Sequence, residues 1–173
     1  MFAKTDIERY YFAKKQLGYM SLFVAAIFII LFIIFFVLIR TDTFRGVAVP
    51  LLVGGLFFAS AGFADYSTSD QRRVRNVYAY DMNRSEIRNN ELPAMKRTVR
   101  NFKISLFVEV AIVLAGIFLI MDFQKQETKL FWSGFGLGLC CVAIVLLIVD
   151  AYAANRAKSY LAGLESFLSK TDT

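Results

Sequence analysis

Residues 17–39, LGYMSLFVAAIFIILFIIFFVLI, form a run of 23 residues without a charged side chain. At 1.5 Å per residue, a helix of this length covers a hydrocarbon layer of about 30 Å. Similar runs occupy residues 46–64 and 130–149, while residues 104–121 form a fourth run that one acid, Glu109, interrupts. The sequence therefore predicts four transmembrane helices.

Overall composition agrees with this interpretation. Hydrophobic residues make up 57% of the 173-residue chain and the mean hydropathy is +0.52. Soluble domains contain roughly 45–50% apolar residues. The excess is concentrated in the four runs, so we expect an all-α integral membrane protein in which two short connections, 40–45 and 122–129, create two antiparallel transmembrane hairpins.

The distribution of basic residues predicts the orientation. Four of the 20 Lys and Arg residues lie in the two short connections: Arg40, Arg45, Lys125 and Lys129. The other 16 lie in residues 1–16, 65–103 and 150–173. Because short cytoplasmic segments are enriched in Lys and Arg, both termini and the middle segment are predicted to be cytoplasmic, most simply at a bacterial inner membrane. The net charge of +6 then follows from topology and from contact with membrane lipids, and predicts no nucleic-acid partner.

Five segments are expected along the chain. Residues 1–16 have the pattern of an interfacial amphipathic helix, and residues 17–64 form the first transmembrane hairpin. Residues 65–103 predict a basic cytoplasmic helical hairpin, in which Pro93 suits the first turn of a new helix. Residues 104–149 form the second transmembrane hairpin, and residues 150–173 predict a cytoplasmic amphipathic helix that either lies on the membrane or packs against the central hairpin.

Small residues mark the expected packing faces of the spans. Glycine and alanine at four-residue spacing let helix backbones approach closely in a membrane. Such a face packs against another helix of the monomer, against a second copy in a homo-oligomer, or against a helix of a partner protein. The candidate residues are Gly54, Gly55, Ala59, Gly62, Gly134 and Gly138.

Three acids lie within or at the ends of the predicted spans. Glu109 is inside a span, about five residues and roughly 8 Å from its cytoplasmic end. A carboxyl at this depth is either a functional partner-recognition or ion-pathway group, or a structural group bonded to Ser60, Ser105 or a boundary cation. Asp65 and Asp150 are the acids at the membrane boundary.

The middle segment carries the candidate docking surface. Arginines there are interleaved with tyrosines and acids, which favours an ordinary solvated face or a docking face for a cytoplasmic protein over a polyanion groove. The docking candidates are Arg72, Arg73, Arg75, Tyr78, Tyr80, Arg97 and Arg100.

Missing residue types restrict the chemistry. The chain contains no histidine, and its two cysteines, Cys140 and Cys141, are neighbours inside a predicted span. Histidine-dependent catalysis is therefore excluded, and we expect no catalytic residues, no metal site and no cofactor. A lipid enzyme that uses Asp65, Asp81 or Asp150 is the weakest alternative, since their spacing does not indicate a metal pair.

The preferred hypothesis is a non-enzymatic four-span membrane protein that acts by protein–protein interaction. One specific form is an immunity protein that neutralises a membrane-inserting toxin, and another is an accessory subunit of a membrane complex. The alternative is a homo-oligomeric channel or membrane-disrupting effector, which is gated by the cytoplasmic hairpin of the chain. One copy of four helices offers little room for a substrate path, so this alternative requires an oligomer.

Overall fold

The computed structural model describes residues 2–123, 125 and 129–169, and these are helical apart from a few connecting residues. The long elements are α1 (Lys4–Ile33, continued by the π-helical η1, Ile34–Ile39), α2 (Asp42–Met82), α4 (Leu92–Phe123) and α5 (Leu130–Ser169). Two short elements, α3 (Arg84–Glu86) and η2 (Ile87–Glu91), connect α2 to α4. Half of the expected second short connection (124 and 126–128) and the end of the expected C-terminal helix (170–173) lie outside the described residues.

Four helices among the described residues are long and apolar enough to cross a membrane, which suggests a membrane protein. They cover Lys4–Ile39, Asp42–Met82, Arg84–Phe123 and Leu130–Ser169, and each has 36 to 41 residues. A hydrocarbon core needs only about 20. Each helix is therefore long enough to extend well beyond the layer that its apolar run could cross.

The expected terminal helices are not separate elements. Residues 4–16 form the first turns of α1, and residues 150–169 form the last turns of α5. Proline occurs only at positions 50 and 93, so no proline interrupts the chain where charged turns meet apolar ones. Pro93 does not begin a new helix as expected, because α4 follows η2 without a break and Pro93 lies inside the continuous helical segment Arg84–Phe123.

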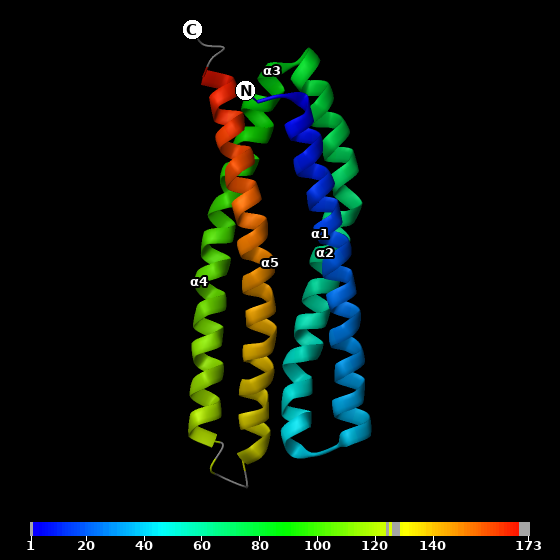
Figure 1. The fold of residues 1–173 in the computed structure, drawn as a ribbon, viewed down its shortest axis with the longest axis vertical. Helices are drawn as coiled ribbons and strands as arrows, with labels where there is room; N and C mark the ends of the chain where they lie inside the picture. The colour runs from blue at the N-terminus through cyan, green and yellow to red at the C-terminus, as the bar shows by residue number, and fades with distance from the viewer. Residues whose placement is uncertain (1, 124, 126–128, 170–173) are drawn as a thin grey trace.

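In the lower part of Figure 1 the long helices lie in the order α4, α5, α2, α1; α1 and α2 then cross, so that the upper part of α2 lies outside α1. The described chain ends lie near α3 at one end of the molecule. Extensive contacts connect α1 to α2, α2 to α5 and α5 to α4, and α1 also touches α5, whereas α1 and α4 have no extensive contact within the described residues. We call residues 17–64, 104–123 and 130–149 the apolar half, and residues 2–16, 65–103 and 150–169 the polar half.

Close backbone contacts build the apolar half. A Cβ added to Gly134 would lie 2.0 Å from the carbonyl oxygen of Thr43, and one added to Gly138 would lie 2.7 Å from that of Val47. Only glycine lets α2 and α5 approach this closely. The inner helix α2 has 44% of its most apolar 18-residue window buried, against 11% in each of the outer helices α1 and α4.

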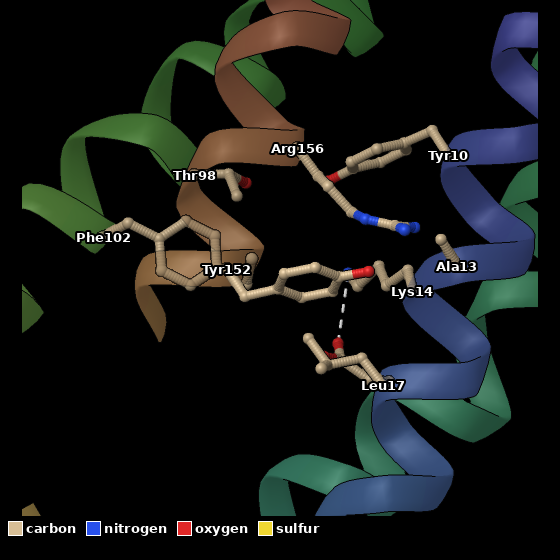
Figure 2. A pocket seen from close by; sticks show the side chains of 10 residues that line it. Tyr10, Ala13, Lys14, Leu17, Thr98, Phe102, Tyr152 and Arg156 are labelled. Atoms are coloured by element: carbon tan, nitrogen blue, oxygen red, sulfur yellow. Dashed lines mark ion pairs between the residues drawn. The ribbon is translucent and has the colours of Figure 1, made fainter. Parts of the chain in front are cut away.

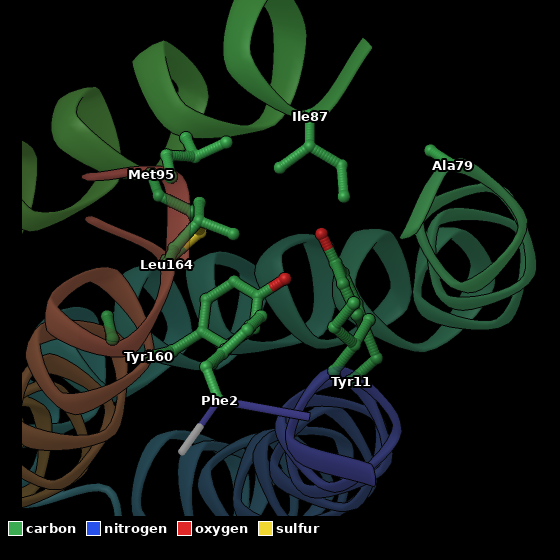
Figure 3. Close-up of a cluster of buried hydrophobic side chains, with 10 residues drawn as sticks. Phe2, Tyr11, Ala79, Ile87, Met95, Tyr160 and Leu164 are labelled. Atoms are coloured by element: carbon green, nitrogen blue, oxygen red, sulfur yellow. The ribbon is translucent and has the colours of Figure 1, made fainter. Parts of the chain in front are cut away.

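Large side chains build the polar half. Tyr11 of α1, Ile87 of η2 and Leu164 of α5 are buried in one cluster, which Figure 3 shows together with Phe2 and Tyr160. Tyr10 and Tyr160 stack with ring centroids 4.3 Å apart. The N-terminal turns of α1 therefore bury their apolar face against α5 and η2, in contrast to the expected interfacial helix whose apolar face lies in lipid.

Candidate functional site

An exposed apolar stripe runs along the polar-half part of α2. Val74, Tyr78 and Met82 are 63%, 64% and 74% exposed, and their spacing of four residues places them on one face of the helix. Val74 lies ten residues and Met82 eighteen residues beyond Ala64, the end of the apolar half of α2. At 1.5 Å per residue these separations are about 15 Å and 27 Å. We call these three residues the α2 stripe.

Arg75 lies beside the α2 stripe, whereas Arg72 lies on the side of α2 that is nearer to Tyr10 and Tyr11 of α1. Arg72 and Arg75 are exposed, and Nε of Arg75 lies 4.0 Å from a carboxylate oxygen of Glu86. Arg73 is less exposed and pairs with Asp70 at 3.7 Å. The sequence-predicted candidates Arg72, Arg75 and Tyr78 therefore lie on the exposed surface of one helix.

The other predicted docking residues lie elsewhere. Tyr80 turns toward the chain termini, where its ring stacks on Phe167 with centroids 4.8 Å apart. Arg97 and Arg100 are exposed on α4, a helix that has no extensive contact with α2 among the described residues. The predicted docking set is therefore divided among different faces of the polar half.

The buried face of α2 is fixed by a polar network around Glu91. This glutamate of η2 is 3% exposed. Its Oε1 accepts hydrogen bonds from the hydroxyls of Tyr11 at 2.7 Å and Tyr160 at 3.3 Å, and its Oε2 accepts one from the Asn76 amide at 2.8 Å. The same amide donates to the Tyr11 hydroxyl oxygen at 2.8 Å. One carboxylate thereby connects α1, α2, η2 and α5.

Burial keeps the tyrosines of this network in their hydrogen-bond-donating form. Burial, followed by the nearby Glu91 carboxylate, raises the pKa of Tyr11 and of Tyr160 far above the ordinary value for tyrosine. Both hydroxyls therefore stay neutral donors across the physiological pH range. A buried network whose members satisfy one another holds the surrounding helices in one arrangement.

A second buried carboxyl, Glu109 of α4, has a different environment. The side chain is 4% exposed, and the Ser105 hydroxyl oxygen lies 2.9 Å from Glu109 Oε1 and 2.8 Å from Asp150 Oδ2. Glu109 Oε2 is buried without a hydrogen-bond partner among the described residues. Of the proposed partners, Ser105 is the one in contact, while Ser60 is exposed and donates to the Phe57 carbonyl.

Ser105 has one hydroxyl hydrogen for two carboxyl neighbours. A serine hydroxyl has one hydrogen to donate, and ionised carboxylates only accept. Ser105 therefore satisfies one of its two carboxyl neighbours as a donor, and the other contact is a hydrogen bond only when that carboxyl itself carries a proton. The Glu109–Ser105–Asp150 cluster thus connects α4 to α5 through one serine hydroxyl.

The predicted glycine residues lie where helices of this chain meet. Gly54 faces Val142 of α5, and Gly55 faces Ile29 of α1. A Cβ on Gly62 would lie 2.9 Å from the carbonyl oxygen of Gly18. Ala59 is half-buried near the same α1–α2 contact. Together with Gly134 and Gly138, these residues contact other helices of the same chain.

A cavity of about 190 Å³ lies where the two halves meet. Figure 2 shows its walls, which come from α1, α2, α4 and α5 and include Lys14, Phe102, Tyr152 and Arg156. The predicted boundary acid Asp65 also lines it and forms an ion pair with Lys14 at 3.1 Å. A wider cavity of about 870 Å³ shares Tyr10, Tyr152 and Arg156 with it and continues between α1 and α5.

Several of these residues carry no recognisable signal in the sequence. The pattern around Asn76 and Glu91 is that of a solvated polar segment, and only the helix pairing shows that both are buried. Tyr11 and Tyr160 are recognisable as members of apolar stripes, but their shared acceptor is not. Arg156 is one of many boundary cations, and its position in a cavity depends on how α1 and α5 diverge.

Comparisons with protein families, curated proteins and solved structures found no match. Among the described residues, no group of three or more acidic or cysteine side chains is arranged to hold a metal ion. The interpretation of function therefore rests on the arrangement of the side chains.

Proposed function

We propose that this chain is a non-enzymatic membrane protein that crosses a bacterial inner membrane four times as two antiparallel hairpins and binds another protein through the α2 stripe. Its polar half, with both termini, lies in the cytoplasm. The excess of Lys and Arg in the polar half supports this orientation.

The observation that carries the proposal is the position of the α2 stripe. Exposed apolar side chains in the apolar half, such as Phe107 and Leu114, have lipid as their natural surroundings. Val74, Tyr78 and Met82 lie about 15–27 Å beyond that half, where lipid tails do not reach. Contiguous exposed apolar groups in water typically mark protein-interaction sites.

The surroundings of the α2 stripe indicate what kind of partner fits. Apolar groups at four-residue spacing match the apolar face of an amphipathic helix. The exposed Arg75 beside them favours a partner with acidic residues along the edge of that face. We therefore expect an acidic amphipathic helix packed along α2.

The test compares two tagged variants in a gentle-detergent pull-down from native cells, with mass spectrometry and the native mass of the particle. Tyr78→Ser removes the centre of the α2 stripe. Phe12→Ser is the matched control, since Phe12 is 65% exposed but lies on α1. We expect a stoichiometric partner with the wild type and with Phe12→Ser, and its loss with Tyr78→Ser.

Two results would contradict this proposal. A partner that stays bound to the Tyr78→Ser variant would show that the α2 stripe is not the docking surface. A particle that contains only copies of this chain would favour the homo-oligomeric channel instead, and bilayer recording would then test for conductance.

Neutralisation of a membrane-inserting toxin is one specific form of the proposed binding. It predicts that a toxin-expressing host grows when the wild-type chain is present and stops growing when Tyr78→Ser replaces it. Growth arrest with both chains would remove this form and leave the role of accessory subunit.

A further inference from the structure

We propose that the cavity at the junction of the two halves, together with the wider cavity beside it, binds the headgroup of an anionic phospholipid of the cytoplasmic leaflet. The inference rests on the membrane topology proposed above but not on the protein partner, so the two proposals fail in different experiments.

The level of the cavity suits a headgroup. Leu17 and Phe102 in its wall lie within two residues of the cytoplasmic ends of the first and third predicted spans, and Tyr152 lies three residues beyond the fourth. Phosphates of the inner leaflet lie at this height in the proposed topology. Tyrosine is enriched at the same interface because its ring and hydroxyl suit apolar and polar surroundings respectively.

The charge of the two cavities suits an anion. Arg9, Lys14 and Arg156 line them, against Asp6 and Asp65. Lys14 is paired with Asp65, and Asp6 accepts a hydrogen bond from the Ala3 N–H at 2.7 Å. Arg9 and Arg156 have no acid within ion-pair distance among the described residues. Two guanidinium groups are therefore available to a ligand.

Arg156 is held in a position suited to a phosphate. Its guanidinium lies over the ring of Tyr152, 4.6 Å from the centroid, and in Figure 2 it extends from α5 toward α1. Stacking on an aromatic ring leaves the N–H edge of a guanidinium free. That edge forms two parallel hydrogen bonds to phosphate oxygens, which is why arginine is common at phosphate sites.

The packing of the helices leaves room for the lipid tails. The cavity wall includes residues of both α1 and α4, two helices that have no extensive contact with each other within the described chain. Toward the apolar half, Leu17 and Phe102 supply apolar contacts. A headgroup bound beside Arg156 can therefore keep its acyl chains in the bilayer between these helices, which distinguishes a lipid from a soluble anion.

The experiment uses the purified full-length protein in neutral detergent. Thermal unfolding is followed during titration with short-chain phosphatidylglycerol, with phosphatidylcholine of the same chain length, and with inorganic phosphate. We expect saturable stabilisation by phosphatidylglycerol alone. Arg156→Gln should weaken this binding about tenfold, the typical effect of losing a charge-assisted hydrogen bond, and Arg156→Lys should recover part of it.

Lys158→Gln is the matched control, because Lys158 is exposed on α5, loses the same charge and lines neither cavity. It should bind phosphatidylglycerol as the wild type does. Equal stabilisation by phosphatidylcholine, or equal weakening by Arg156→Gln and Lys158→Gln, would overturn the proposal. Equal stabilisation by inorganic phosphate would show a soluble-anion site and would also overturn it. Should Arg156→Gln fail to fold, Arg9→Gln replaces it, with a smaller but specific loss expected.

Discussion

The two halves of the molecule are held together by different means. In the polar half, aromatic rings and a hydrogen-bonded carboxylate fill the space between α1, α2, η2 and α5. In the apolar half, glycine residues bring the backbones of α2 and α5 into contact, and the outer faces of α1 and α4 are exposed. In the proposed topology, water drives apolar burial in the first case, whereas helices surrounded by lipid gain stability mainly from close packing.

The two buried glutamates show the same difference. Glu91 has hydrogen-bond donors on both of its oxygens, whereas Glu109 has one oxygen bonded and one without a partner among the described residues. A fully satisfied buried carboxylate is structural and costly to remove. Depth of burial alone, 3% against 4% exposed, does not separate these two roles, but the hydrogen-bond partners do.

The largest effect is expected at Glu91. Glu91→Leu leaves the hydroxyls of Tyr11 and Tyr160 and the amide of Asn76 without their acceptor, at about 1–3 kcal/mol for each buried group. We therefore expect a loss of about 4 kcal/mol in the free energy of unfolding, measured by denaturation in mixed micelles. Glu91→Gln keeps one acceptor oxygen and should cost about 1 kcal/mol. A Glu91→Leu variant as stable as the wild type would contradict the structural role of the network.

An intermediate effect is expected where backbones touch in the apolar half. Gly134→Ala places a methyl group against the Thr43 carbonyl, so α2 and α5 must separate, and overpacking of this kind costs about 1–3 kcal/mol. The control is Gly55→Ala, whose methyl group would be 3.2 Å from the flexible side chain of Ile29. If both variants lost the same stability in the same denaturation assay, the backbone contact would not be the cause.

The smallest effect is expected at Glu109. Glu109→Gln replaces a carboxyl that has one oxygen without a partner among the described residues by a neutral amide of the same shape. The free energy of unfolding should therefore change by less than about 1 kcal/mol. Ser105→Ala removes the hydroxyl between the two carboxyls and should cost more than Glu109→Gln does. A loss at Glu109→Gln as large as that at Glu91→Leu would show that the two carboxyls have the same role.

Hydropathy predicts the number and the approximate position of the four apolar helices, because uncharged runs of about 20 residues are rare in soluble folds. The arrangement of these helices as membrane hairpins stays a prediction. The pattern does not show that residues 4–16 continue into α1, since an amphipathic turn beside an apolar run is equally typical of a separate interfacial helix. Spacing places Val74, Tyr78 and Met82 on one face of α2, but only the packing shows that this face is exposed.

The connection between the first two long helices has a consequence for biosynthesis. Only Arg40 and Thr41 separate η1 from α2, and Arg40 adopts a left-handed backbone conformation with φ 56°, where its Nε donates to the Val37 carbonyl at 2.7 Å. A connection of this length is too short for α1 to move into the bilayer while α2 is still outside it. In the proposed topology, α1 and α2 must enter the bilayer together, as a preformed pair, during synthesis.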